Sequence, residues 1–131
     1  MTKQVGVVVV TYNSESFLEP CLSAALRVGP AVVVDNASAD GTVARARGVE
    51  GVRVVANLSN LGFAGAVNQG FRLLSTPYVL LLNPDAILGT GVDALVAACR
   101  DQQTGAATGQ LVHPTGEPQF GFTVRRLPRW E

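Results

Sequence analysis

The sequence predicts an α/β protein with a Rossmann-like, mainly parallel sheet and helices on both faces. Short runs of apolar, mostly β-branched residues recur along the 131-residue chain, and the segments between them carry helical patterns. This alternation of strand and helix is typical of right-handed βαβ units. The first four runs are almost wholly apolar, as expected of strands that helices cover on both faces.

Five strands are predicted from these runs: Val5–Val10, Ala31–Val34, Val52–Ala56, Tyr78–Leu82 and Ala106–Val112. Four helices are predicted: one beginning near Pro20, whose apolar residues follow a spacing of three and four, then Asp40–Arg47, Gly62–Leu74 and Val92–Arg100. Pro20 suits the first turn of a helix. Gly48 is expected to end the second helix.

Composition excludes several classes of function. Ten basic and ten acidic residues cancel, so the chain has no electrostatic footprint for nucleic acid or an anionic membrane. No stretch approaches the ~20 apolar residues of a membrane span, and Val5–Val10 is too short for a signal-peptide core. Cys21 and Cys99 lack CxxC spacing and are expected to be buried, reduced thiols. We therefore expect a cytoplasmic protein, peripheral to the inner face of the membrane where its acceptor is membrane-bound.

Polar residues gather directly after the first four predicted strands. The clusters are Thr11-Tyr12-Asn13-Ser14, Asp35-Asn36-Ala37-Ser38 with Asp40-Gly41-Thr42, Asn57–Gly62 before a helix that carries Asn68, and Asn83-Pro84-Asp85. The carboxyl ends of parallel strands share one edge, and ligands of open α/β sheets bind outside those ends. Each cluster alone is explained by capping or a turn, so the prediction of one shared site depends on their joint pattern.

Asp85 is the residue on which the functional prediction turns. It follows an apolar strand, where a carboxylate is costly unless it meets water or a ligand. A hard divalent cation accepts carboxylate oxygen and keeps positions open for phosphate oxygens, so Asp85 predicts a Mg²⁺ or Mn²⁺ site that also holds a diphosphate. Tyr12 suits stacking on a base, and Asp35 can accept from a base or ribose donor. Gly62 precedes a helix whose N-terminus can approach a phosphate.

Three other nucleotide-binding classes lack their signatures here. A dinucleotide-binding domain would show G-x-G-x-x-G directly after the first strand, where this chain has Thr11-Tyr12-Asn13-Ser14. A P-loop NTPase needs G-x-x-x-x-G-K-[ST], and no lysine follows Lys3. A sugar nucleotidyltransferase would carry a glycine-rich loop with a basic residue after the first strand, and that loop is absent.

Four segments in succession resemble the motifs of the inverting family-2 glycosyltransferases, which have the GT-A fold. They read VVVTYNSESFLEPCL ending at Leu22, VVVDNASADGT at 32–42, NLGFAGAVNQG at 60–70 and YVLLLNPDA at 78–86. The match runs over about residues 5–112. The Asn-Leu-Gly-Phe and Asn-Pro-Asp spelling is similar to the rhamnosyltransferase-like branch, which builds bacterial cell-wall and surface polysaccharides.

The resemblance implies transfer of a sugar, with inversion, from a nucleoside diphosphate sugar to a hydroxyl of a saccharide or lipid-linked saccharide. The spelling leans toward a dTDP-sugar, and a UDP-sugar fits the same loops. The residues implied to bind the donor are Thr11, Tyr12, Asn13, Asp35, Asn36, Gly62, Phe63, Asn68, Asn83 and Asp85.

The resemblance also implies a role for most of these residues. Thr11 and Tyr12 would line the base with Asn13 beside them, and Asp35 would bind the base edge. The nucleotide and its diphosphate would be bordered by Gly62, Phe63 and Asn68. Asn83 stands where many relatives have the first Asp of Asp-x-Asp, near the ribose, which removes one negative charge. Asp85 stands in the metal-binding place.

The end of the chain is expected to lead away from this site. Residues 1–112 are predicted to form the nucleotide-sugar-binding domain, and residues 113–131 an irregular segment leading to a missing acceptor-binding part. The family's catalytic carboxylate lies well downstream of the metal motif, and neither Glu117 nor Glu131 has a matching context. We therefore expect the general base to be absent from this chain, which would bind donor without efficient turnover.

Two further expectations follow from such a truncation. The alternative to an enzyme is a non-catalytic nucleotide-sugar-binding module or a degenerate remnant. A Glu-Asp pair encoded in the reading frame beyond Glu131 would favour the enzyme. Apolar surface left bare by truncation would favour a homo-oligomer.

Overall fold

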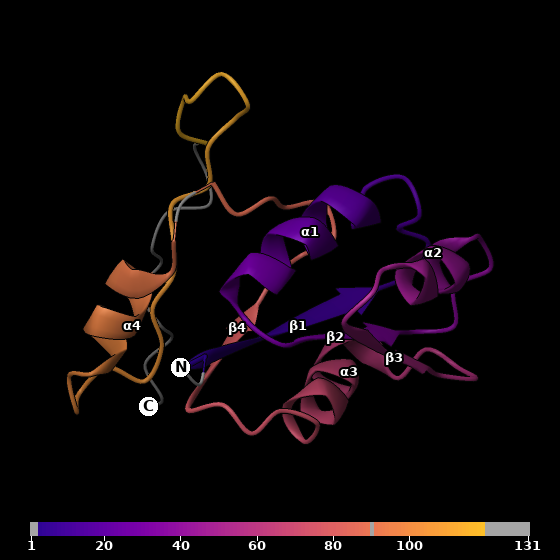
Figure 1. Cartoon of the computed structure of the whole chain (residues 1–131), viewed down its shortest axis with the longest axis horizontal. Helices are drawn as coiled ribbons and strands as arrows, with labels where there is room; N and C mark the ends of the chain where they lie inside the picture. The colour runs from indigo at the N-terminus through magenta and orange to yellow at the C-terminus, as the bar shows by residue number, and fades with distance from the viewer. Residues whose placement is uncertain (1–2, 90, 120–131) are drawn as a thin grey trace, which may run out of the picture. The chain divides into compact units, whose positions relative to one another are not determined.

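The computed structural model describes residues 3–89 and 91–119. Strands and helices alternate along them, as Figure 1 shows: β1 (Val5–Thr11), α1 (Leu18–Val28), β2 (Ala31–Asp35), α2 (Thr42–Gly48), β3 (Val52–Ala56), α3 (Gly62–Phe71), β4 (Tyr78–Leu81) and α4 (Asp93–Cys99). The chain divides into two compact units between Gly91 and Val92, and the first holds the whole sheet. No helix in the described part has the length and apolarity that crossing a membrane requires.

The sheet has the strand order β3-β2-β1-β4, and its three pairs of neighbours are all parallel. The chain runs from β1 outward to β2 and β3, then returns to place β4 on the other side of β1. The strand order therefore reverses between β1 and β4. Such a reversal leaves a crevice outside the carboxyl ends of the strands, where open α/β sheets bind their ligands. The predicted α/β class with a parallel sheet is confirmed.

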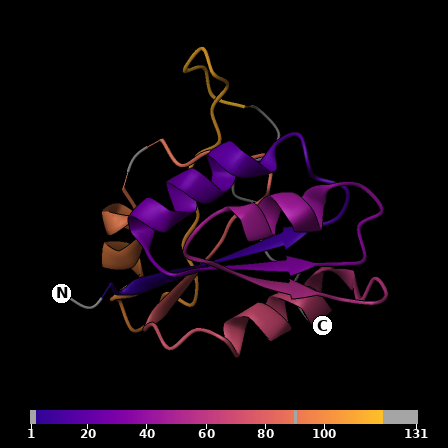
Figure 2. The same ribbon diagram turned by 45° about the vertical axis from the view of Figure 1, so that its right-hand side comes forward.

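Helices cover both faces of this sheet (Figure 2), with α1 and α2 on one face and α3 on the other. Successive side chains of a strand point to opposite faces, so β1 and β2 supply two cores. Val7, Val9 and Val33 pack with residues of α1 and α2, whereas Val32 and Val34 pack with α3. Strands buried on both sides need apolar residues throughout, which explains the unbroken valine runs.

Close packing fixes α3 against the second face. A Cβ added at Gly70 would lie 2.6 Å from a methyl carbon of Val8. Glycine at this point of α3 therefore lets the helix approach β1, although glycine weakens a helix interior. The position of α3 matters for function because its first residues lie at the carboxyl edge of the sheet.

The helix boundaries differ from the predicted ones for local reasons. Helix α1 begins at Leu18, so Pro20 lies inside its first turn, where a missing N–H costs nothing because the first N–H groups have no intrahelical partner. Helix α2 begins at Thr42 because Asp40 accepts a hydrogen bond from the Thr42 N–H. Helix α3 ends at Phe71, and the next residues continue in tighter turns up to Leu74.

Two strand predictions need correction. The segment Tyr78–Leu82 was expected to be buried, but β4 is an edge strand of the described sheet, and Leu81 is 45% exposed. The fifth strand predicted at Ala106–Val112 is wrong. Those residues lie in the second unit and form only an isolated antiparallel bridge from Val112 to Pro118. Their alanine and glycine content gives little preference for a strand.

Candidate functional site

Four loops leave the sheet at the same edge. In the register of the strands, Thr11 pairs with Asp35, and Asp35 pairs with Ala56. Strand β4 ends nearer the amino end of β1 than β2 does, because its last residue, Leu81, pairs with Val8. The structure therefore brings the four polar clusters to one edge of the sheet, with the loop after β4 beside β1 at the point where the strand order reverses.

The Asp35 carboxylate is buried at this edge and hydrogen-bonded to neighbouring residues. It is 1% exposed and accepts hydrogen bonds from the Thr11 hydroxyl at 2.8 Å, the Ser38 N–H at 2.9 Å and the Ser38 hydroxyl at 2.5 Å. A buried carboxylate is stable only with such partners. Thr11 is also fully buried. The predicted contacts of Thr11 and Asp35 with a base stay predictions.

The loop after β1 is held against the loop after β2. The N–H of Asn13 donates to the Ser38 hydroxyl, and the Asn13 side-chain oxygen accepts from the Ala39 N–H, both at 2.8 Å. Asn13 has a φ of 50°, a left-handed conformation that asparagine tolerates better than most residues. These contacts leave the side chain of Tyr12 57% exposed at the edge. An exposed aromatic ring on a fixed loop can stack on a flat ligand.

Asp40 fixes the same two loops from outside. Its carboxylate accepts from the Thr42 hydroxyl and N–H and, at 3.3 Å, from the N–H of Glu15. These hydrogen bonds, that of the Thr42 hydroxyl foremost, hold the pKa of Asp40 below its ordinary value. The ionised carboxylate therefore joins the start of α2 to the loop after β1.

Helix α3 presents three predicted residues at the surface, Gly62 and Phe63 at its start and Asn68 in its second half. Gly62, Phe63 and Asn68 are all exposed. Gly62 has a φ of 74°, which glycine adopts without strain. Its carbonyl accepts at 3.1 Å from the side chain of Asn36, which is itself buried. Asn36, which is predicted to bind the substrate, is thus also hydrogen-bonded to the first residue of α3.

The loop after β4 differs, because no described residue bonds its carboxylate. Asp85 is exposed, and its side chain makes no hydrogen bond or ion pair within residues 3–89 and 91–119. The Asn83 carbonyl accepts from the Ala86 N–H at 3.0 Å and from the Cys21 thiol at 3.4 Å. Burial of Cys21, together with the negative charge of Asp85, raises the pKa of that thiol to about 11. Cys21 is therefore a neutral donor beneath the loop.

The donor set at this edge fits one kind of metal site. No group of three or more His, Cys, Asp or Glu side chains that could hold a metal occurs in the part of the chain that the structure describes. A lone exposed carboxylate suits Mg²⁺ or Mn²⁺ bound together with phosphate oxygens and water. Asp85 therefore fits a metal shared with a diphosphate.

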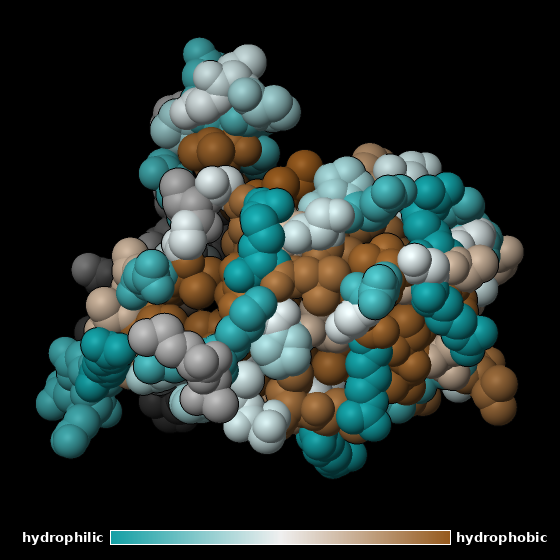
Figure 3. Space-filling view, viewed as in Figure 1, coloured by the Kyte–Doolittle hydropathy of each residue, from teal (hydrophilic) through white to brown (hydrophobic). Residues whose placement is uncertain are grey.

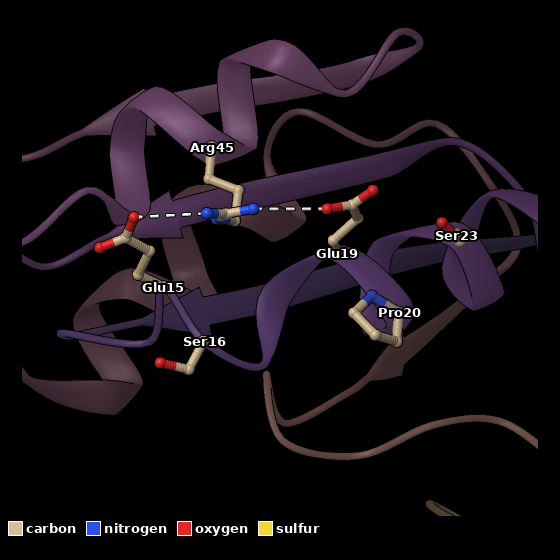
Figure 4. A pocket seen from close by; sticks show the side chains of 6 residues that line it. All are labelled: Glu15, Ser16, Glu19, Pro20, Ser23 and Arg45. Carbon is tan, nitrogen blue, oxygen red and sulfur yellow. Dashed lines mark hydrogen bonds and ion pairs between the residues drawn. The ribbon is translucent and has the colours of Figure 1, made fainter.

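A separate hollow of about 520 Å³ lies between α1 and α2 (Figure 4). Its lining consists of Glu15, Ser16, Glu19, Pro20, Ser23 and Arg45. The Arg45 guanidinium lies between Glu15 and Glu19, 3.4 Å from each carboxylate. Exposed pairs of this kind contribute little to stability. The hollow contains none of the predicted site residues, and its charges are paired with each other.

Comparison with known proteins agrees with this geometry. The profile of the family described as glycosyl transferase family 2 matches residues 6–130. A solved mannosyltransferase from Pyrobaculum calidifontis, in complex with GDP-Man and Mn²⁺, is similar with a TM-score of 0.64 and 26% sequence identity. The match covers 80% of this chain and 34% of that one, so the chain spans about a third of that protein. No protein with a curated description matches.

The family match extends over nearly the whole chain, and the four-stranded parallel sheet with its helices matches the GT-A fold of the solved neighbour. The chain belongs to glycosyl transferase family 2.

Proposed function

We propose that this chain binds the nucleoside diphosphate part of a sugar donor at the carboxyl edge of its sheet, and serves the inverting transfer of that sugar to an acceptor hydroxyl. The observation that carries the proposal is the exposed carboxylate of Asp85 where the strand order reverses, which has no partner within residues 3–89 and 91–119. Its neighbours offer an aromatic ring and a helix start at the same edge.

Each exposed residue has a place in this proposal. Asp85 would hold Mg²⁺ or Mn²⁺, and Asn83 would bond a ribose hydroxyl. Tyr12 would stack on the base. The nucleotide and its diphosphate would lie against Gly62, Phe63 and Asn68.

The four remaining predicted residues lie nearer the interior or are already bonded. Asp35 and Thr11 would reach a base only if the loop that carries Ser38 moved, because Ser38 bonds the Asp35 carboxylate. Asn13 and Asn36 would shape the site through the backbone groups that they hold.

The metal has a defined chemical purpose here. A bound divalent cation neutralises the negative charge that develops on the leaving diphosphate. Asp85 would contribute the protein oxygen for that cation, and neither of its oxygens has a partner among the described residues. The solved neighbour is a complex with Mn²⁺ and GDP-Man, which supports a metal-dependent nucleotide-sugar site in this chain.

The finer assignments are proposals as well. We propose a rhamnosyltransferase-like enzyme of cell-wall or surface polysaccharide synthesis, acting on a dTDP- or UDP-sugar at the cytoplasmic side of a membrane. GDP belongs in any test, because the neighbour's donor carries it. The catalytic base is not assigned to a residue of this chain. A non-catalytic nucleotide-sugar-binding module is the alternative, and transfer measured at an ordinary enzyme's rate would exclude it.

Self-association belongs to the proposal too. Large hydrophobic side chains are exposed on the first unit: Tyr12, Phe17, Leu58, Leu61, Phe63 and Phe71 among them. Figure 3 shows hydrophobic surface between hydrophilic side chains on the face in view. Exposed apolar surface of this kind favours association with a partner or a second copy, which light scattering over a range of concentrations would detect.

Calorimetric titration tests the binding proposal. We expect UDP, dTDP or GDP to bind the wild-type chain more tightly with Mn²⁺ than without it, and Asp85→Asn to abolish that difference. Glu50→Gln is the matched control, because Glu50 is an exposed carboxylate next to the amino end of β3, at the opposite edge. Equal Mn²⁺ dependence in the wild type and Asp85→Asn would reject the role of Asp85.

A further inference from the structure

Three side-chain amides form a connected chain beside the proposed donor site. The Asn57 Nδ2 group donates to Gln69 Oε1 at 2.8 Å, and Gln69 Nε2 donates back to Asn57 Oδ1 at 2.9 Å. The Asn57 Nδ2 group also donates to Asn36 Oδ1 at 3.2 Å. This amide chain, Asn36–Asn57–Gln69, joins residues that follow β2 and β3 to a residue near the end of α3.

Asn36 extends the amide chain to the backbone at the start of α3. Its Oδ1 accepts from the Leu61 N–H at 3.3 Å, and its Nδ2 donates to the Gly62 carbonyl at 3.1 Å. The side chain is 3% exposed. One buried amide thus holds both a donor and an acceptor of the turn that leads into the helix.

The segment held in this way has few other contacts. Residues 58–61 are all exposed, and Gly62 N–H bonds within the segment, to the Asn60 side chain at 2.8 Å. Asn57, the residue directly before this segment, donates its backbone N–H to the Asp35 carbonyl at 2.9 Å. Exposed loops with few packed contacts open at low free-energy cost, so the hydrogen bonds of Asn36 determine where Leu61 and Gly62 lie.

The pairing of Asn57 with Gln69 supports the same orientation of the Asn36 amide that the Leu61 N–H and the Gly62 carbonyl require. An asparagine amide can turn over and exchange its oxygen and nitrogen. Because Asn57 uses its oxygen toward Gln69, its remaining N–H points at Asn36 and requires an oxygen there. That orientation places the Asn36 nitrogen at the Gly62 carbonyl. Networks whose groups are all satisfied specify one arrangement.

We propose that Asn57 and Gln69 are positioning residues, which act through Asn36 to hold Leu61 and Gly62 where the donor diphosphate binds. The inference rests on the proposed function and deepens it. Neutral amides suit this place, because carboxylates would repel a diphosphate, whereas the start of a helix attracts it. Gln69 and Asn57 touch no ligand in this account.

Binding measurements on a double-mutant cycle test the proposal. Loss of one or two hydrogen bonds is worth a roughly threefold to tenfold change in equilibrium, so we expect Gln69→Leu and Asn57→Ala each to raise the Kd for UDP, dTDP or GDP with Mn²⁺ by that factor. The double variant should match Asn57→Ala, because both changes break the same pair. Gln4→Leu is the control, since Gln4 is exposed just before β1 at the opposite edge.

Amide hydrogen exchange in the ligand-free protein gives an independent measurement. Exchange of the Leu61 N–H, which Asn36 protects, should be several-fold faster in Gln69→Leu and unchanged in Gln4→Leu. Unchanged exchange at Leu61 would overturn the proposal whatever the nucleotides do. So would faster exchange with an unaltered Kd, or effects on Kd that simply add. If the wild type bound none of the three nucleotides, the proposed function would fail, and exchange at Leu61 alone would then decide whether the amide chain positions the loop.

Discussion

The two sides of the carboxyl edge are built differently. On one side, the loops after β1, β2 and β3 are joined by side-chain hydrogen bonds through Ser38, Asp35 and Asn36. On the other side, the loop after β4 presents Asp85 to solvent without a partner in the described residues. The first side is a preformed surface, and the second keeps a charge free for a ligand.

This difference separates the energetic roles of two aspartates that look alike in the sequence. A buried, hydrogen-bonded carboxylate stabilises the fold, and its removal leaves its hydrogen-bond donors without an acceptor. An exposed carboxylate is solvated and contributes little to stability. Asp35 should therefore matter for folding and Asp85 for binding, although both follow a strand at the same edge.

The largest effect is expected on stability at Asp35. Replacing it with alanine leaves the Thr11 and Ser38 donors unpaired in a buried place, so Asp35→Ala should lower the free energy of unfolding by about 3 kcal/mol. Asp85→Asn, the counterpart on the open side, should change it by less than about 0.5 kcal/mol. Urea denaturation measures both. Similar losses for the two variants would remove the distinction between the two sides.

The next effect concerns Tyr12, the exposed ring on the preformed side. Stacking on a base is worth about 1 kcal/mol or more, so Tyr12→Ala should weaken nucleoside diphosphate binding about fivefold to tenfold. The loss should be the same with and without Mn²⁺, because the ring acts on the base and not on the diphosphate. Calorimetric titration with and without Mn²⁺ measures both affinities. A loss of affinity that occurs only with Mn²⁺ would mean that Tyr12 acts on the metal-bound diphosphate and not on the base.

A smaller effect is expected from the pH dependence of Asp40. Because hydrogen bonds lower its pKa in the folded protein, the ionised carboxylate adds stability above its ordinary value of 3.8. That stability is lost as the pH falls through the lowered pKa. Asp40→Asn should therefore melt at a lower temperature than the wild type at neutral pH, with the difference shrinking in acid below about pH 4. A constant difference down to about pH 2 would contradict this.

The smallest effect is expected at the hollow between α1 and α2. Arg45→Gln removes two exposed ion pairs, which together should contribute less than about 1 kcal/mol of stability. Nucleotide affinity should stay unchanged. A marked loss of affinity would mean that this hollow belongs to the binding site, and that the preformed side extends beyond the loops.

The sequence predicts the layered fold well because its signals are local. The valine runs of β1 and β2 and the helical spacing around Leu22 indicate their elements without knowledge of partners. The segment Ala106–Val112 misleads, because an apolar run becomes a strand only where a neighbouring strand can pair with it.

The candidate site is predictable in its location but not in its internal bonding. Strand ends place Asp35 and Asp85 at one edge. Only the structure shows that the hydroxyls of Ser38 and Thr11 donate hydrogen bonds to the Asp35 carboxylate. The pairing of Asn57 with Gln69 was also missed. A glutamine on a short helix gives no sign of a partner outside that helix, and the half-buried position of Gln69 follows from packing that the sequence does not show.

Electron paramagnetic resonance of Mn²⁺ tests the central claim, that Asp85 holds a metal jointly with a diphosphate. Free Mn²⁺ gives a signal that weakens when the ion binds to protein. We predict little binding to the chain alone, clear binding when UDP, dTDP or GDP is added beyond what the nucleotide itself binds, and loss of that gain in Asp85→Asn but not in Glu50→Gln. The same gain in Asp85→Asn would contradict the account.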